Sequence, residues 1–399
     1  MRYLILILVF FSGSIILFAD EQQKKSAEDT THTHSEYDAT ATTIHHISDA
    51  NVLNILNLVQ IPLPCIVYEK GHGLKVFMSS VFKPGHHDNG HYAYDGYVLF
   101  EGNLHKVEDP SFPMGKVEVE SFGHGEHKTM YSQGREYHIL GRSTLDGGMM
   151  GGEKNSPFYD FSITKNVLAM ILVALLAFWM FSKAARAYTQ RDGQAPKGLQ
   201  SFLEPLFTFI RDEVAIPFIG KSKYLKYLPL LMSLFIFILG LNLFGQIPFF
   251  GGINATGNLA VTMVLALVVF FIVNLNGKKD YWKHIFWMPG VPVLLKPLLA
   301  FVEVLGLFIK PITLMLRLAG NITAGHIAIL SFIGLIFIFG KAGESFGGGL
   351  VGTGLSVPLT LFMMSIELIV AFVQAFVFTI LTASYIGAAI EEHHHDDHH

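Results

Sequence analysis

Long apolar runs alternate with short polar segments over roughly the last three-fifths of the chain. A helix needs about 20 consecutive apolar residues to cross the core of a bilayer. Runs of about this length therefore predict membrane-spanning helices. The predicted spans cover about residues 163–181, 228–249, 259–273 and 357–390. This pattern indicates a membrane protein.

A further apolar region, from Val291 to Phe339, is too long for one perpendicular span. Prolines interrupt it, and a proline ends or kinks a helix because it lacks a backbone N–H. We therefore predict a short interfacial or re-entrant helix near residues 293–308, followed by a long tilted helix over about residues 311–339. The Gly-rich segment GESFGGGLVGTG is predicted to be a loop that leads into the last span.

Basic residues are unevenly distributed between the spans, and their distribution predicts the topology. Lys and Arg concentrate between the first two spans and after the third, whereas the loop GGINATGN contains neither. Basic loops stay in the cytoplasm, so the C-terminus is expected inside and the residues before the first span outside. The amphipathic segment 199–220 is predicted to lie along the interface. We predict five crossings.

The first 19 residues have the layout of a secretory signal peptide. One positive charge, Arg2, is followed by an apolar core and a small residue. Leu17 fits the small-x-small cleavage rule poorly, so an uncleaved anchor is the alternative. Arg2 would hold the N-terminus of such an anchor inside. Both alternatives export the residues that follow.

Residues 20–160 are predicted to form an exported extension. The part up to residue 50 is polar and rich in histidine, which predicts disorder. Residues 51–62 are predicted to form a short amphipathic helix. From about residue 74 to 140, aromatic and β-branched residues alternate between Gly, Pro and Asn, which predicts a small antiparallel β module. Residues 147–152 predict a flexible linker.

The composition supports the membrane assignment. Hydrophobic residues make up 51% of the chain and charged residues only 15%, with a mean hydropathy of +0.43. Soluble proteins carry about a quarter charged residues. The net charge of −4 excludes a strongly basic nucleic-acid-binding protein. A single cysteine, Cys65, excludes an intramolecular disulfide and a cysteine metal cluster.

The sequence gives no sign of a cofactor, either in its histidine clusters or as a nucleotide-binding motif. His86, His87 and His91 lie close together in HHDNGH, but their spacing fits no strong zinc pattern. We interpret them as solvated loop residues. The histidine-rich tail of residues 393–399 could chelate a metal, and we assign it no function. The chain has no GxxxxGK[ST] phosphate-binding loop, so it is not expected to bind ATP itself.

Several polar residues remain inside the apolar helices, and Arg317 is the most informative. A guanidinium at that depth costs several kcal/mol, and it cannot lose its proton to avoid this cost. Snorkelling to the interface is the alternative, but apolar residues extend far on both sides of Arg317. A functional role is therefore predicted. The retained polar residues are Glu303, Lys310, Arg317, Asn321, His326, Glu367 and Gln374.

The spacing of these residues suggests how they act together. Asn321 lies four residues after Arg317, so both share a helix face. His326 lies about 13.5 Å beyond Arg317 along the axis, and Glu367 and Gln374 lie about 10.5 Å apart on one face. If the last two helices pack antiparallel, Gln374 falls near the level of Arg317 and Glu367 near that of His326. His326 and Glu367 then form a pair suited to taking up protons.

Some of these residues have a simpler explanation. Asn321 and Gln374 could each join two helices by hydrogen bonding alone. This explanation fits poorly for the four ionisable residues Arg317, Glu367, Glu303 and His326 together, because ionisable groups in spans are expensive.

Three segments of the membrane half carry a family resemblance: YLPLLMSLFIFILGLNLFGQIPF, KPITLMLRLAGNITAGH and QAFVFTILTASYIGAAIEEH. They resemble the a subunit of the F-type ATP synthase. The run RLxGNxxAG followed by QAFxFxxLTxxY is specific to that family, and the similarity covers about residues 160–393. The resemblance implies a non-catalytic subunit of a bacterial inner membrane, in contact with a ring of c subunits and with the b-subunit peripheral stalk. Each c subunit carries a mid-membrane carboxyl group.

The resemblance assigns roles around the arginine. Arg317 matches the family's essential arginine, which faces the ring carboxylates and separates two aqueous half-channels. Asn321 and Gln374 match polar positions that flank this arginine. A ring carboxylate beside Arg317 stays ionised, because a nearby positive charge favours the charged form. It must take up a proton before it turns into lipid, where a bare carboxylate is expensive.

The resemblance also assigns residues to the two half-channels. Glu303 matches an acidic residue associated with the cytoplasmic half-channel. His326 and Glu367 match the family's external pair. The best-known bacterial members have Glu first and His second, whereas this chain has the reversed order found in mitochondrial members. The exported extension departs from the family, whose N-terminal extension is short.

The sequence thus predicts an all-α polytopic membrane protein with about five transmembrane helices, interfacial helices and a long tilted helix hairpin, preceded by a small β-rich exported extension. The predicted parts are a signal peptide (1–19), the extension (20–160), the membrane domain (161–392) and a cytoplasmic tail (393–399). Two alternatives stay open: sodium as the coupled ion, and a self-sufficient ion channel or secondary transporter. The chain lacks the internal repeat common in transporters.

Overall fold

A computed structural model describes most of the chain. The described residues are 48–55, 59–69, 71–85, 88–124, 128–140, 158–191, 193–247, 252–288, 291–340 and 345–391. The predicted signal peptide, the linker at 147–152, His86, His87 and the tail of 393–399 lie outside them. The chain divides into two compact units: residues 1–170, 245–254 and 326–365 form one, and residues 171–244, 255–325 and 366–399 form the other.

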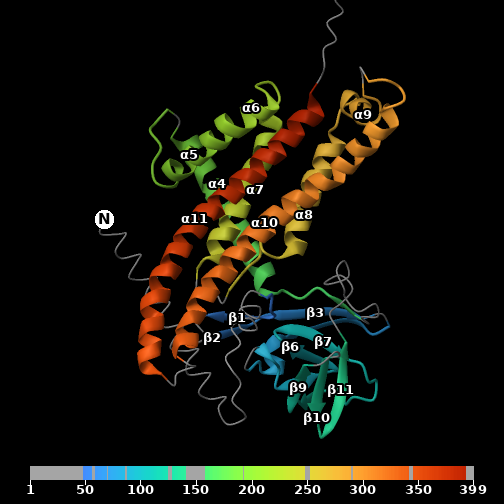
Figure 1. Cartoon of the computed structure of the whole chain (residues 1–399), viewed down its shortest axis with the longest axis vertical. Coiled ribbons are helices and arrows are strands. Elements are labelled where there is room, and N and C mark those ends of the chain that lie inside the picture. The colour runs from blue at the N-terminus through green and yellow to red at the C-terminus, as the bar shows by residue number, and fades with distance from the viewer. Residues whose placement is uncertain are drawn as a thin grey trace, which may run out of the picture. The chain divides into compact units, whose positions relative to one another are not determined.

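The extension is built of antiparallel strands, as the alternation of its residues predicts (Figure 1). One sheet has the order β8-β5-β6-β7-β11-β10-β9, a second β12-β3-β4, and β1 pairs with β2. The strands are β1 Val52–Ile55, β2 Val59–Pro62, β3 Pro64–Glu69, β4 Gly73–Met78, β5 Tyr92–Tyr94, β6 Tyr97–Phe100, β7 Asn103–Val107, β8 Lys116–Glu118, β9 Ser121–His124, β10 Lys128–Ser132, β11 Arg135–Leu140 and β12 Phe158–Asp160.

Tight turns fix the register of this β module. Asp95 and Gly96 join β5 to β6 with φ values of 49° and 78°, and Glu101 with Gly102 joins β6 to β7 in the same way. Two successive positive φ values match the right-handed twist of a hairpin, and glycine adopts them without strain. The predicted β module is confirmed.

Residues 51–62 are not an amphipathic helix, so that prediction was wrong. They contribute β1 and β2, which pair antiparallel from Val52 opposite Pro62. Tertiary contacts decide in favour of the strands: Asn51 donates its backbone N–H to Gly102 O at 2.7 Å, and Asn54 Nδ2 donates to Asp88 Oδ1 at 2.8 Å. A short apolar run cannot be assigned to helix or strand by periodicity alone.

The membrane domain is helical throughout its described elements. Among the described residues, four helices are long and apolar enough to cross a membrane, or up to five if α8 and α9, bent by 103°, form one span. About five crossings were predicted. The helices are α4 Lys165–Gln190, α5 Leu199–Phe209, a π-helical turn Ile210–Ala215, α6 Ile216–Ile219, α7 Tyr224–Gly245, α8 Leu259–Leu275, α9 Lys279–Phe286, α10 Lys296–Gly340 and α11 Phe346–Ile390.

Two predicted breaks are absent, so those predictions were wrong. A single helix, α10, runs through Pro311, where we expected a re-entrant helix to end and a new helix to begin. Helix α11 begins at Phe346, inside the predicted Gly-rich loop. A bilayer offers no water to unpaired backbone groups, which favours continuing a helix despite a proline.

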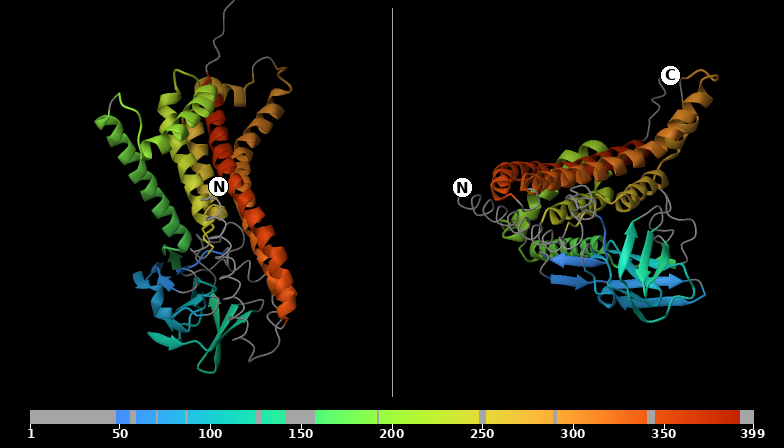
Figure 2. Two further views of the ribbon diagram at one scale, coloured as in Figure 1. Left: turned by 90° about the vertical axis from the view of Figure 1, so that its left-hand side faces the viewer. Right: turned by 60° about the horizontal axis from the view of Figure 1, so that its bottom comes forward.

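Glycines let α10 and α11 approach closely, and both helices run side by side (Figure 1 and Figure 2). A Cβ on Gly348 would overlap Phe339 O, and one on Gly352 would lie 3.0 Å from Ile336 Cα. Small residues at helix contacts are typical of membrane proteins, because they permit close van der Waals packing. Gly348 and Gly352, which lie in the predicted loop, instead form part of the contact between the two helices.

The core of the second unit centres on α7. Leu231, Phe235 and Ile238 of this helix are fully buried among apolar side chains of α8, α10 and α11. One turn further, Asn242 Nδ2 donates a hydrogen bond to Ala371 O of α11 at 3.1 Å. This polar contact fixes the height of α11 against α7.

Replacing Gly387 with alanine should destabilise the protein by about 1–3 kcal/mol. The added Cβ would overlap Phe218 O, a backbone atom that cannot rotate away. The measurement is the thermal unfolding midpoint of the purified chain. Gly354→Ala on the same helix is the matched control, because nothing lies within 4 Å of its added Cβ. Equal midpoints for the two variants would contradict this packing.

Candidate functional site

Arg317 lies on an exposed face of α10, together with Asn321 one turn further along. The surface around them is apolar: Ile312 and Leu316 of α10 are half exposed. Ile369 of α11 is 65% exposed. Among the described residues, Arg317 forms no ion pair with a carboxylate. A charged side chain that faces lipid from a spanning helix is expensive, so Arg317 indicates a polar or charged partner at this face.

The two polar residues predicted on α11, Glu367 and Gln374, are both buried. A Cβ on Gly325 would lie 3.0 Å from Glu367 Oε1, so the carboxyl group packs directly against α10 at this glycine. Gly325 immediately precedes His326 in the chain. Glu367 thus lies at the height along α10 that antiparallel packing predicts.

His326 belongs to the other unit, where it is half-buried. A Cβ on Gly245 would lie 3.7 Å from its Nε2. Lys165, at the start of α4, is close enough for its charge to act on His326. His326 and Glu367 fall in different units, and their pairing stays a prediction.

Polar residues near Lys165 were not predicted from the sequence. The backbone N–H of Lys165 donates to Ala50 O at 2.9 Å, and that of Asn166 to Asp49 Oδ1 at 3.2 Å. Asn166 Oδ1 accepts from the N–H of Asn254 at 3.2 Å. These bonds join the extension, the first spanning helix and the loop before α8. No local motif announces them, because the partners lie far apart in the sequence.

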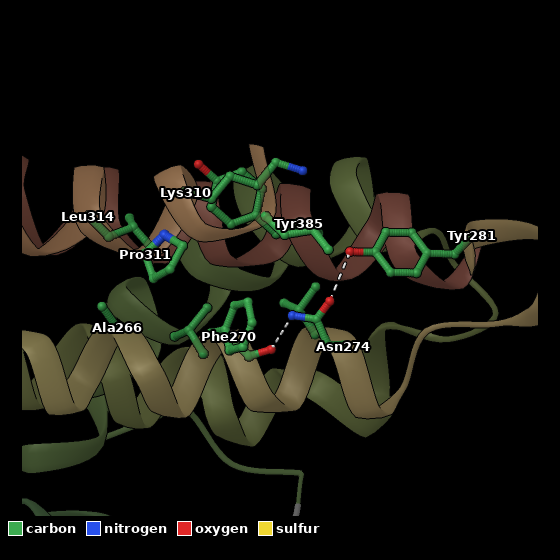
Figure 3. A pocket seen from close by; sticks show the side chains of 11 residues that line it. Ala266, Phe270, Asn274, Tyr281, Lys310, Pro311, Leu314 and Tyr385 are labelled. Carbon is green, nitrogen blue, oxygen red and sulfur yellow. Dashed lines mark hydrogen bonds between the residues drawn. The ribbon is translucent and has the colours of Figure 1, made fainter. Parts of the chain in front are cut away.

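A small cavity lies between α8, α10 and α11 (Figure 3). Its volume of about 20 Å³ is enough for one water molecule. Tyr281 donates from its hydroxyl to Asn274 Oδ1 at 3.2 Å, and Lys310 Nζ lies 5.4 Å from the centre of the Tyr385 ring. Glu303, half-buried on α10, is close enough to act electrostatically on Tyr281.

The predicted site residues fall on both sides of Arg317. Glu303 precedes it by about 21 Å along α10, and Lys310 of the cavity lining lies between the two in the chain. His326 follows it by about 13.5 Å in the opposite direction.

Metal ligation receives no support within the described part of the chain. There, no three His, Cys, Asp or Glu side chains come together as metal ligands. His86, His87 and the tail of 393–399 lie outside these residues.

Comparison with known proteins places this geometry in a family. A family described as "ATP synthase A chain" matches residues 167–387, and a "Domain of unknown function (DUF8433)" matches residues 42–128. The subunit a of Chlorobium phaeobacteroides (strain BS1) ATP synthase is 38% identical, covering 69% of this chain and 80% of its own length. That of Pelodictyon phaeoclathratiforme is 37% identical over 73% and 85%.

A third relative supports the same assignment. The ATP synthase subunit a of Myxococcus xanthus (strain DK1622) is 42% identical, with 60% of this chain and 77% of the relative covered. The family match includes Arg317 and the helices that carry the buried polar residues. With its apolar spanning helices and this match over more than half of its length, the chain belongs to the ATP synthase A chain family, the membrane-embedded a subunits of the Fo sector.

Proposed function

We propose that this a subunit carries protons along two half-channels against a ring of c subunits and thereby couples proton flow to ring rotation and ATP synthesis. The observation that carries the proposal is the exposed Arg317 on an apolar face, without an ionic partner among the described residues. Its counter-charge is then the carboxylate of a facing c subunit.

Arg317 acts as an electrostatic barrier. Its positive charge keeps a passing ring carboxylate ionised, and that carboxylate needs a proton before it enters lipid. Arginine does not release its own proton, so it cannot pass protons directly between the half-channels. Proton flow therefore has to turn the ring.

The external half-channel includes His326 and Glu367, and the cytoplasmic half-channel includes Glu303. The side chains of histidine and glutamate can each take up and release a proton, which suits them to a proton path. The cavity beside Tyr281 could hold one water molecule within reach of the cytoplasmic path. Asn321 and Gln374 are the polar residues that flank this barrier. His326 favours protons over sodium, which is the second candidate ion.

The proposal includes the predicted topology and partners. Residues 1–19 export the extension of residues 20–160, and the membrane domain of residues 161–392 ends in a cytoplasmic tail. The subunit contacts the c ring and the b-subunit peripheral stalk. ATP is made elsewhere in the complex, and this chain supplies no catalytic group.

Reconstitution tests this function against a self-sufficient channel or transporter. The purified chain alone should leave proteoliposomes as tight to protons as empty ones, because half of each path lies on the ring. Complete ATP synthase should pump protons on addition of ATP, with or without sodium. Robust ion transport by the chain alone would refute the proposal. If ATP-driven pumping strictly required sodium, the coupled ion would be sodium and not the proton.

A further inference from the structure

The sheet β12-β3-β4 has one buried and one exposed face. Side chains alternate along β3 and β4, so Cys65 and Val67 point into the core of the module. Leu74 is 63% and Val76 62% exposed on the opposite side. We call this second side the outer face. It comprises Ile66, Tyr68, Leu74, Val76, Met78 and Tyr159.

The register makes the outer face a continuous apolar surface. Tyr159 pairs with Tyr68, Tyr68 with Leu74, and Ile66 with Val76. Directly paired side chains in antiparallel strands lie about 5 Å apart. The rings of Tyr68 and Tyr159 stack with their centres 6.4 Å apart. None of the six side chains is charged, and a contiguous apolar surface on a folded module marks an interaction site.

A short tether holds this sheet near the membrane. Beyond β12, the N–H of Phe161 donates to Ile66 O at 2.8 Å, and that of Ile163 to Pro64 O at 3.0 Å. Helix α4, a spanning helix, begins two residues later at Lys165. Even a fully extended chain from Asp160 to Lys165 covers only about 17 Å. The strand end therefore stays within that distance of the start of a spanning helix.

The chemistry of the outer face matches the lipid headgroup region. Tyrosine is enriched at membrane–water interfaces, where its ring meets apolar chains and its hydroxyl meets water. Aliphatic side chains on an interfacial surface insert to the boundary of the acyl chains. Phe161, on the tether itself, is 56% exposed and continues the apolar surface toward α4.

We propose that the outer face lies on the outer leaflet of the bilayer and anchors the extension to lipid. This inference rests on the membrane-spanning nature of α4 and on the proposed export of the extension, and it does not depend on the ion that the subunit carries. The extension is then a membrane-surface module as well as an exported one.

Spin labelling of intact ATP synthase in lipid nanodiscs tests this inference. A nitroxide on Val76→Cys should collide several-fold more with oxygen, relative to a water-soluble nickel chelate, than one on Glu118→Cys. Glu118 is exposed on β8, which is in the other sheet. The native Cys65 is fully buried, and burial raises the pKa of its thiol to about 12, so it should remain unlabelled.

Leu74→Cys is an independent site on the same face and should give the same ratio. Nickel collisions at both sites equal to those at Glu118→Cys would show a face open to water and overturn the proposal. Protection from both oxygen and nickel would show a protein cover, either another subunit or a retained segment of residues 1–19, and would also overturn it. Proton pumping by the labelled enzyme is a separate measurement, so failure of one proposal is distinguishable from failure of the other.

Discussion

Replacing Arg317 with alanine is expected to abolish ATP-driven proton pumping, with a loss of about 100-fold or more. The charge stabilises the ionised ring carboxylate by several kcal/mol in a membrane setting, and each 1.4 kcal/mol corresponds to about tenfold. Without it, the carboxylate keeps its proton and the barrier between the half-channels is lost. The measurement is ATP-driven acidification of inverted vesicles, together with their passive proton permeability.

Two further variants sharpen this test. Arg317→Lys keeps a positive charge that can lose its proton when buried, so pumping should be only partly restored. Arg211→Ala removes an arginine that is partly exposed and pairs with Asp212 at 2.7 Å, outside the spanning helices. This control should pump normally. Pumping that survives in Arg317→Ala would refute the role of Arg317.

Replacing Glu367 with glutamine should lower ATP-driven proton pumping by about 10-fold or more. Glutamine has a similar shape but cannot take up or release a proton, and a positioned proton-transfer group typically contributes about 10²–10⁴-fold to a rate. Glu367 is buried against Gly325, so no nearby solvent replaces it easily. The measurement is the initial rate of acidification at equal enzyme content.

The matched control for this variant is Glu391→Gln. Glu391 is exposed just beyond the end of the same helix, and its loss should leave the rate unchanged. Glu367→Asp, which keeps a titratable group, should retain more activity than Glu367→Gln. Equal rates for Glu367→Gln and the unsubstituted enzyme would remove Glu367 from the proton path.

Local patterns predicted most elements for clear physical reasons. The alternation around β4 to β11 predicted strands because successive side chains point to opposite faces. Apolar length predicted α4, α7 and the larger parts of α10 and α11, because the bilayer thickness sets the length of a span. The sequence failed at residues 51–62, where a short apolar run fits either element, and at Pro311, where a local rule was overruled by the environment.

Some residues of the candidate site were identifiable in the sequence, and others only in the structure. Arg317 was identifiable in the sequence because an ionised group in an apolar run is expensive wherever the helix packs. The importance of Gly325 was not identifiable in the sequence. Its lack of a side chain matters only because Glu367 of another helix packs against it. Lys165 and Asn166 also escaped notice, because their partners come from distant segments.

The sequence by itself determined that this chain has membrane-spanning helices, carries a β module before them and keeps a permanent charge within an apolar run. Hydrophobic length, alternation and charge are local properties, so each is readable without a structure. Only the tertiary structure decided the continuity of α10 and α11, the burial of Glu367 and the apolar outer face of the sheet. These three features depend on contacts between residues that are far apart in the sequence, and such contacts form only when the chain packs.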